Sequence, residues 1–137
     1  MTARPNYSGD ASTATQCTRI STANATRSVS GTISTIYTPG SNGGKVKRIS
    51  MKAIDDTTAG TITLYTSSNS GSTWRVWKDI AVTSVTTSAS TPPWEAELTM
   101  VEGELGIDGY DVGATGRIGA SPTNAETFDI TVSAPSF

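Results

Sequence analysis

Short segments in which apolar and polar residues alternate are the feature that most constrains the fold of this chain. The clearest runs from Trp94 to Met100, where every second residue is Glu95, Glu97 or Thr99. A strand places successive side chains on opposite faces, so this pattern predicts a strand with one buried face. Similar segments between turn signals lie at 27–38, 48–53, 61–65, 74–82, 110–114 and 128–132. No stretch has the roughly 3.6-residue apolar period of an amphipathic helix.

The composition supports the same class of fold. Val, Ile and Thr make up 42 of the 137 residues, and β-branched side chains favour pleated strands over helices. A chain of this length forms one domain. We therefore predict an all-β fold, an antiparallel β-sandwich or jelly roll of about seven or eight strands. Residues 1–17 are polar without periodicity and are expected to form an extended N-terminal arm, and residues 18–137 the single β-sandwich domain.

Charge and residue usage exclude several classes of function. Ten basic residues stand against 12 acidic ones, which leaves no basic excess for binding nucleic acid through phosphates. No apolar run approaches the length of a membrane span, and residues 1–17 have no apolar core of a secretory signal. The chain has no His and one Cys, Cys17. Ser-His-Asp and Cys-His catalysis are therefore excluded, and Cys17 is expected to be an inert thiol.

Two groups of carboxylates are candidate sites. Asp55 and Asp56 could supply half of a calcium site, but calcium needs six to eight oxygen ligands, and a solvated turn is the favoured interpretation. Glu95 and Glu97 lie on one strand face at a spacing that a glycosidase pair could use. Because that face is the solvent side, a plain outer face is favoured. We predict no catalytic residue, no metal and no cofactor.

Aromatic residues give the candidate partner-binding positions. Trp74 and Trp94 share the parity of core residues, and Trp94 is predicted to be buried between two sheets. Tyr65 and Trp77 have the opposite parity on strands joined by the turn at Asn69-Ser70-Gly71. Exposed aromatic side chains often mark an interface. Together with Ile36, these two residues are expected to be covered by another copy or another chain.

Several stretches of the sequence together have the pattern of a known family, namely 45–49, 52–53, 57–60, 62–65, 77–80 with Val82, 91–94, 109–114 and 124–130. They resemble small structural proteins of tailed phages, most of all capsid decoration proteins, also called cement or head auxiliary proteins. The resemblance covers roughly residues 36–137. Such proteins are typically small β-barrel or jelly-roll domains, often trimers, that clamp neighbouring major capsid subunits from outside. They offer no catalytic residues to transfer to this chain.

The resemblance implies a non-enzymatic virion protein that is made in the host cytoplasm and stabilises the outer capsid surface by binding the major capsid protein. A homotrimer is favoured, with a dimer next, and no nucleic acid or membrane partner is expected. Arg4 and Tyr7 of the arm are expected to contact the capsid, and deleting residues 1–17 is expected to leave the fold intact. The alternative function is a tail-fibre or receptor-binding domain. A glycosidase ranks third, because no convincing acid pair is present.

Overall fold

The computed structural model describes residues 13–100 and 110–136, in which all regular structure is β-strand. The first five strands are β1 (Thr13–Ile20), β2 (Ser34–Tyr37), β3 (Gly44–Val46), β4 (Arg48–Ala53) and β5 (Gly60–Ser67). The others are β6 (Arg75–Val82), β7 (Glu95–Thr99), β8 (Tyr110–Val112), β9 (Arg117–Pro122) and β10 (Phe128–Ser136). No helix in the described ranges is long and apolar enough to cross a membrane.

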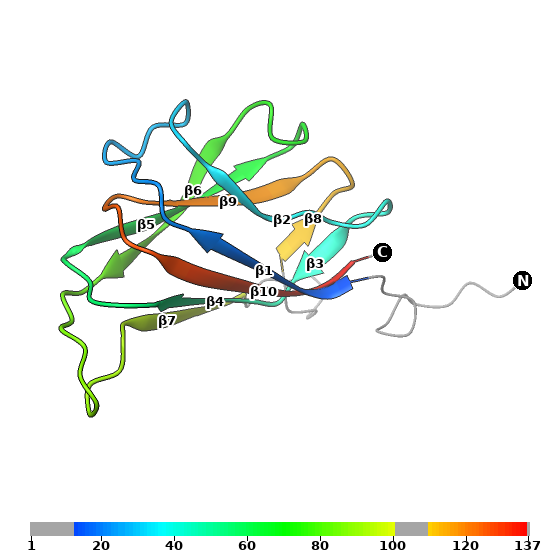
Figure 1. Ribbon diagram of the computed structural model, residues 1–137. Helices are drawn as coiled ribbons and strands as arrows, with labels where there is room; N and C mark the ends of the chain where they lie inside the picture. Colours follow the sequence, from blue (N-terminus) through cyan, green and yellow to red (C-terminus); the bar gives the residue numbers. More distant parts are fainter. Residues whose placement is uncertain (1–12, 101–109, 137) are drawn as a thin grey trace, which may run out of the picture.

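The strands form two stacked antiparallel sheets, which confirms the predicted all-β sandwich (Figure 1). The six-stranded sheet has the order β7-β4-β10-β3-β8, with β1 pairing the other side of β10. The four-stranded sheet has the order β2-β9-β5-β6. The ten strands exceed the expected seven or eight because β1, β3 and β9 lie outside the segments in which the sequence alternates.

The core lies between the sheets and follows the alternation that the sequence shows. Ile49, Met51 and Ala53 of β4 are buried, as are Phe128 and Ile130 of β10. Trp94 is 8% exposed, and its ring meets the ring of Phe128 edge to face with centroids 5.7 Å apart. The prediction that Trp94 belongs to the core is therefore confirmed.

One seam of the sandwich is closed by a side chain. The amide of Gln16, on edge strand β1, donates to the carbonyl oxygen of Thr38 at 2.7 Å and accepts from its N–H at 2.9 Å. These bonds imitate a strand pair and join the edge of the six-stranded sheet to the chain just after β2. They satisfy the backbone N–H and carbonyl oxygen of Thr38, which would otherwise be open to another chain.

The boundary predicted for the N-terminal arm is wrong by several residues. Strand β1 begins at Thr13, and Gln16 and Cys17 pair with Val132 and Thr131 of β10. The last part of the predicted arm is therefore an edge strand of the six-stranded sheet. Polar residues at 13–19 gave no apolar alternation because this strand exposes its outer side. Residues 1–12 lie outside the described residues.

Candidate functional site

The carboxylate pairs proposed as catalytic or metal sites are engaged in structural bonds. Asp56 accepts hydrogen bonds from the Thr87 hydroxyl at 2.7 Å and from the Thr87 N–H at 2.8 Å. These bonds lower the pKa of Asp56 below its ordinary value. Asp55 caps the N–H of Asp56 at 2.9 Å. Within residues 13–100 and 110–136, no group of three His, Cys, Asp or Glu side chains is placed to hold a metal ion.

Glu95 and Glu97 lie on an exposed face of the six-stranded sheet and pair with cations of the neighbouring strand β4. Glu95 lies 3.4 Å from the Lys52 ammonium, and Glu97 lies 3.8 Å from the Arg48 guanidinium. Among the described residues, the hollow beside these carboxylates has no aromatic side chain in its lining. The interpretation as an outer surface is therefore favoured over a glycosidase pair.

The strand register aligns four charges across this face. Arg19, Asp129, Lys52 and Glu95 are successive partners on β1, β10, β4 and β7, so positive and negative side chains alternate. Arg19 donates two hydrogen bonds to Asp129, at 2.8 and 3.0 Å. These bonds lower the pKa of the Asp129 carboxyl and raise the pKa of Arg19. We call these four residues, with Arg48 and Glu97, the paired-charge face.

Ile36 is not a surface residue, which corrects its assignment as a partner contact. It is 1% exposed and belongs to the core. Thr35 and Tyr37 pair with consecutive residues of β9, so Ile36 is the extra residue of a β-bulge. The bulge breaks the alternation, and both Ile36 and Tyr37 point into the core.

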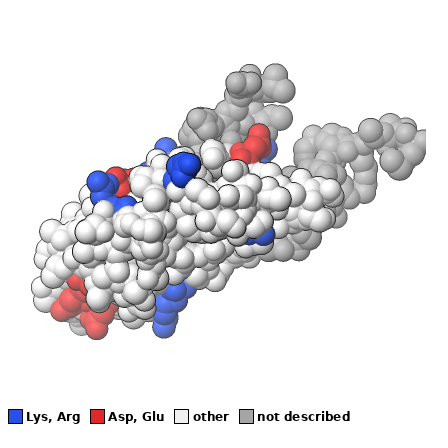
Figure 2. Space-filling model, turned by 90° about the horizontal axis from the view of Figure 1, so that it is seen from above, with Lys and Arg blue, Asp and Glu red and all other residues white. Residues whose placement is uncertain are grey.

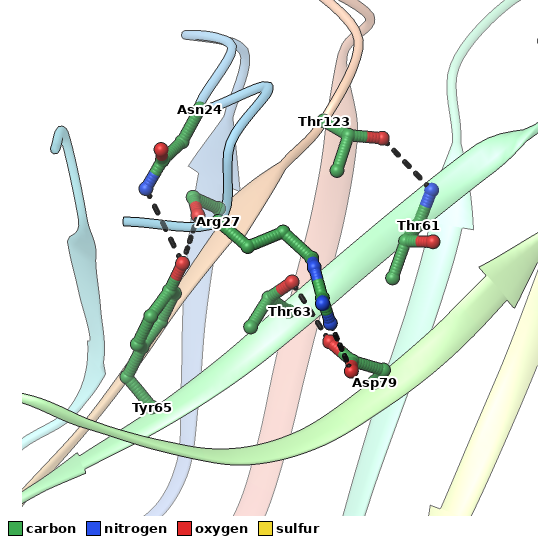
Figure 3. Close-up of polar contacts among 8 residues, drawn as sticks. Asn24, Arg27, Thr61, Thr63, Tyr65, Asp79 and Thr123 are labelled. Carbon is green, nitrogen blue, oxygen red and sulfur yellow. Dashed lines mark hydrogen bonds and ion pairs between the residues drawn. The ribbon is translucent and has the colours of Figure 1, made fainter. Parts of the chain in front are cut away.

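Tyr65 is on the outer side of the four-stranded sheet, as its parity indicates, but its own chain covers it. Residues 21–33, here called the strap, cross this side, and Tyr65 is 0% exposed. The Tyr65 hydroxyl accepts hydrogen bonds from the amide of Asn24 at 3.2 Å and from the hydroxyl of Ser121 at 3.3 Å (Figure 3). Tyr65 therefore anchors the strap, and its assignment as a partner contact is wrong.

Other contacts fix the strap along the same sheet. Arg27 forms an ion pair with Asp79 of β6, and Asp79 also accepts from the Thr63 hydroxyl at 2.9 Å (Figure 3). Trp74 lies on this outer side with Ile33, because a Cβ built on Gly119 would meet both side chains within 3 Å. The interpretation of Trp74 as a core residue from its parity is therefore wrong. Seen from this side, the surface is mostly uncharged (Figure 2).

Trp77 is half-buried at the open seam between β6 and β8. Leu64 and Tyr65 of β5 pair with Lys78 and Val76, so Trp77 is the extra residue of a second bulge. Its ring stacks on Tyr110 with centroids 4.6 Å apart, and the Lys78 ammonium lies 5.5 Å from the ring centroid. Of the three predicted contacts from the domain, Trp77 alone keeps part of its surface open to a partner.

Two adjoining hollows lie beside this aromatic pair. Both are lined by Thr66, Ser67, Ser68 and Tyr110. Arg75 also lines the hollow of about 350 Å³, and Arg117 also lines the hollow of about 200 Å³. We call Arg75, Trp77, Lys78, Tyr110 and Arg117 the cationic corner.

Sequence reasoning missed most of this corner. The run from Trp74 to Lys78 mixes two basic residues with two Trp residues and was a usable signal. Arg117 lies 42 residues after Arg75 and reaches the corner only through the pairing of β9 with β5. The predicted contacts Arg4 and Tyr7 lie outside the described residues.

The described chain begins near this corner. Thr13 pairs with Ser136, Ser136 with Gly44, and Gly44 with Val112 of β8, the strand that begins at Tyr110. These four residues lie on adjacent strands at one end of the six-stranded sheet (Figure 1). The predicted arm is therefore attached at the end of the sandwich that carries the cationic corner.

Comparison with protein-family models, curated proteins and solved structures gave no match to this chain.

Proposed function

We propose that this protein is a non-enzymatic structural protein of a tailed-phage virion that decorates the outer capsid surface and stabilises it by binding the major capsid protein. Its sandwich is of the jelly-roll type in this proposal. The resemblance of residues 36–137 to phage structural proteins suggests this function. The all-β sandwich agrees with the β fold that the resemblance implies.

The structural observation that carries the proposal is the position of the arm. Residues 1–12 precede Thr13, at the end of the sandwich where β1, β10, β3 and β8 lie side by side. An arm attached there and the surface beside it can contact one partner together. Ordering each arm residue costs about 1–2 kcal/mol of backbone entropy, so the capsid contacts must exceed that cost.

The oligomer belongs to the same proposal, with a homotrimer ahead of a dimer. Since Ile36 and Tyr65 are buried within one chain, the contact between copies falls to other apolar surface. Val76 is 49% exposed on β6, next to Trp77, and gives this edge an apolar contact of its own. Light scattering at high protein concentration measures the state, and a clean monomer would contradict the trimer.

The function is tested by adding purified protein to capsids stripped of it and measuring occupancy. The matched variant lacks residues 1–12, because deleting 1–17 would also remove strand pairs such as Cys17↔Thr131. We expect full-length protein to bind and the shortened protein, still folded, to bind more weakly. Particles without the protein should assemble but release DNA at lower temperature. Equal binding by both forms would refute the role of the arm, and binding by neither would refute decoration.

The alternative is a tail-fibre or receptor-binding domain, because hollows lined by hydroxyl groups and a half-buried tyrosine also suit a receptor. The two functions place the protein at different sites. Immuno-electron microscopy of intact particles separates them, since a decoration protein labels the head and a receptor-binding domain labels the tail tip.

A further inference from the structure

We propose that the cationic corner is the docking site for a carboxylate-rich segment of the partner protein. The inference rests on the proposed function in one respect, which is that the partner is the major capsid protein. It follows from how the described cations are distributed. Five of them, namely Arg19, Arg27, Lys45, Arg48 and Lys52, form ion pairs with Asp or Glu side chains.

Three cations of the cationic corner differ from these five. In the part of the chain that the structure describes, Arg75, Lys78 and Arg117 form no ion pair with a carboxylate. All three surround the same aromatic pair, Trp77 and Tyr110. The nearest described carboxylate in the lining, Asp111, is itself paired with Lys45 at 2.6 Å. Among the described residues, the corner is thus a local excess of positive charge on a chain whose net charge is −2.

The three cations are held in place by their surroundings. The Arg117 guanidinium donates to the carbonyl oxygens of Gly116 at 2.6 Å and Ala114 at 3.3 Å. Arg75 donates to the carbonyl oxygen of Trp74 at 3.3 Å. Lys78 lies over the Trp77 ring, where a cation–π contact restrains it. Each uses only part of its donor capacity, so the remaining N–H groups are available to a partner.

The turn just before Arg117 is also fixed. The Thr115 hydroxyl donates to the carbonyl oxygen of Ser68 at 2.8 Å, and the Ser70 N–H donates to that of Thr115 at 2.7 Å. These bonds join the β8–β9 turn to the β5–β6 turn. Restraining the cations before binding lowers the entropy lost when a partner docks.

The hollows match acidic side chains in size and chemistry. At about 200 and 350 Å³, one lies below and the other at the lower end of the roughly 300–1,000 Å³ of small-molecule sites. Each has one guanidinium and the shared hydroxyl-bearing residues Thr66, Ser67 and Ser68. Guanidinium binds carboxylate through two parallel hydrogen bonds, and hydroxyl groups can donate to the same oxygens. Two Glu or Asp side chains of one segment would therefore occupy the two hollows.

The edge strand itself argues for recognition through side chains. Lys78 pairs with the core residue Leu64, so this charged residue lies on the inner side of edge strand β6, and Trp77 forms a bulge beside it. Inward-facing charges and bulges discourage the addition of another strand. Three cations are also too few for the many phosphate contacts of a nucleic-acid site. An acidic protein segment fits these features best.

The test uses the full chain and a fluorescent hexaglutamate peptide, with binding followed by anisotropy at low salt. The full chain keeps the acidic residues 102, 104 and 108 present during the measurement. The variant is Arg75→Gln with Arg117→Gln. The matched control, Arg48→Gln with Lys52→Gln, removes the same charge from the paired-charge face. Circular dichroism establishes that both variants are folded.

We expect the corner variant to lower the affinity at least about fivefold and the control to change it less than about twofold. Raising the salt should weaken wild-type binding. Equal losses in the two variants, or no loss in the corner variant, would overturn the site. Polygalacturonate serves as the saccharide probe, and binding of it without binding of hexaglutamate would overturn the assignment to a protein segment.

Stripped capsids separate this inference from the proposed function. If wild-type protein decorates capsids but does not bind hexaglutamate, the docking site is wrong and decoration stands. If it binds hexaglutamate through the corner but does not decorate capsids, decoration is wrong and the carboxylate site stands. Support for both requires that the corner variant also occupy capsids less than the control does.

Discussion

The two outer faces of the sandwich differ in how their outward-facing side chains find partners. The paired-charge face of the six-stranded sheet is open to solvent, and its side chains neutralise one another across four strands. The outer side of the four-stranded sheet bears Tyr65 and Trp74, and the strap covers it. An aromatic residue on an outward-facing position therefore need not mark an interface, because a loop of the same chain can bury it.

The largest effect on stability is expected for a substitution in the core between the sheets. Replacing Trp94 with Ala removes a buried ring that contacts Phe128 and should destabilise the protein by about 3–5 kcal/mol. Chemical denaturation followed by circular dichroism measures the loss. A Trp94→Ala variant that unfolds at the same denaturant concentration as the wild-type protein would contradict the core assignment.

The next largest effect should distinguish the covered face from the open one. A Cβ at Gly119 would lie 2.5 Å from Ile33 and 2.9 Å from Trp74, so Gly119→Ala must displace the strap or the ring. We expect a loss of about 1–3 kcal/mol from overpacking. Thr131→Ala, on the outer side of β10, is the control and should stay within about 0.5 kcal/mol. Similar results for the two variants would remove the distinction between the faces.

The hydrogen bonds of the strap should contribute less than its packing. Tyr65→Phe keeps the ring but removes the acceptor of the Asn24 and Ser121 hydrogen bonds. Leaving these buried groups without that partner should cost about 1–2 kcal/mol of unfolding free energy. Tyr110→Phe is the control at a half-buried position, and its midpoint in urea should be nearly unchanged. An unaltered midpoint for Tyr65→Phe would show that the hydroxyl does not hold the strap.

The smallest effect concerns the open face and its pH dependence. The folded-state pKa of Asp129 lies below its ordinary value because Arg19 donates hydrogen bonds to it. A depressed folded pKa gives stability that is present above the unfolded pKa and is lost as the pH falls through the folded pKa. NMR titration should show Asp129 ionising below the usual aspartate range, and Arg19→Gln should raise that pKa. No change in Arg19→Gln would contradict the pairing.

Sequence alternation predicted those parts of the fold in which the strand period is unbroken. It placed Trp94, Met51 and Ile130 in the core correctly. Met51 and Ile130 lie in regular strands with one face against the other sheet, and Trp94 directly precedes the regular strand β7. It failed for Ile36, since a bulge reverses the side on which the next residue lies. No local pattern marks where such an extra residue is inserted.

The candidate site was harder to predict than the fold. Tyr65 was placed on the correct side of its strand, but the strap that buries it comes from residues far away in the chain. The cationic corner combines Arg75 and Arg117 through strand pairing, and their lack of carboxylate partners follows from the whole arrangement of charges. Pairings of this kind depend on tertiary structure.

The proposal that the protein decorates a capsid is tested most directly by its amount in purified particles that contain it. Gel densitometry against the major capsid protein gives the ratio of the two chains. A decoration protein bound across the capsid lattice should be present in numbers comparable to the major capsid protein. A trace amount of a few copies per particle, as for a tail tip, would contradict the proposal.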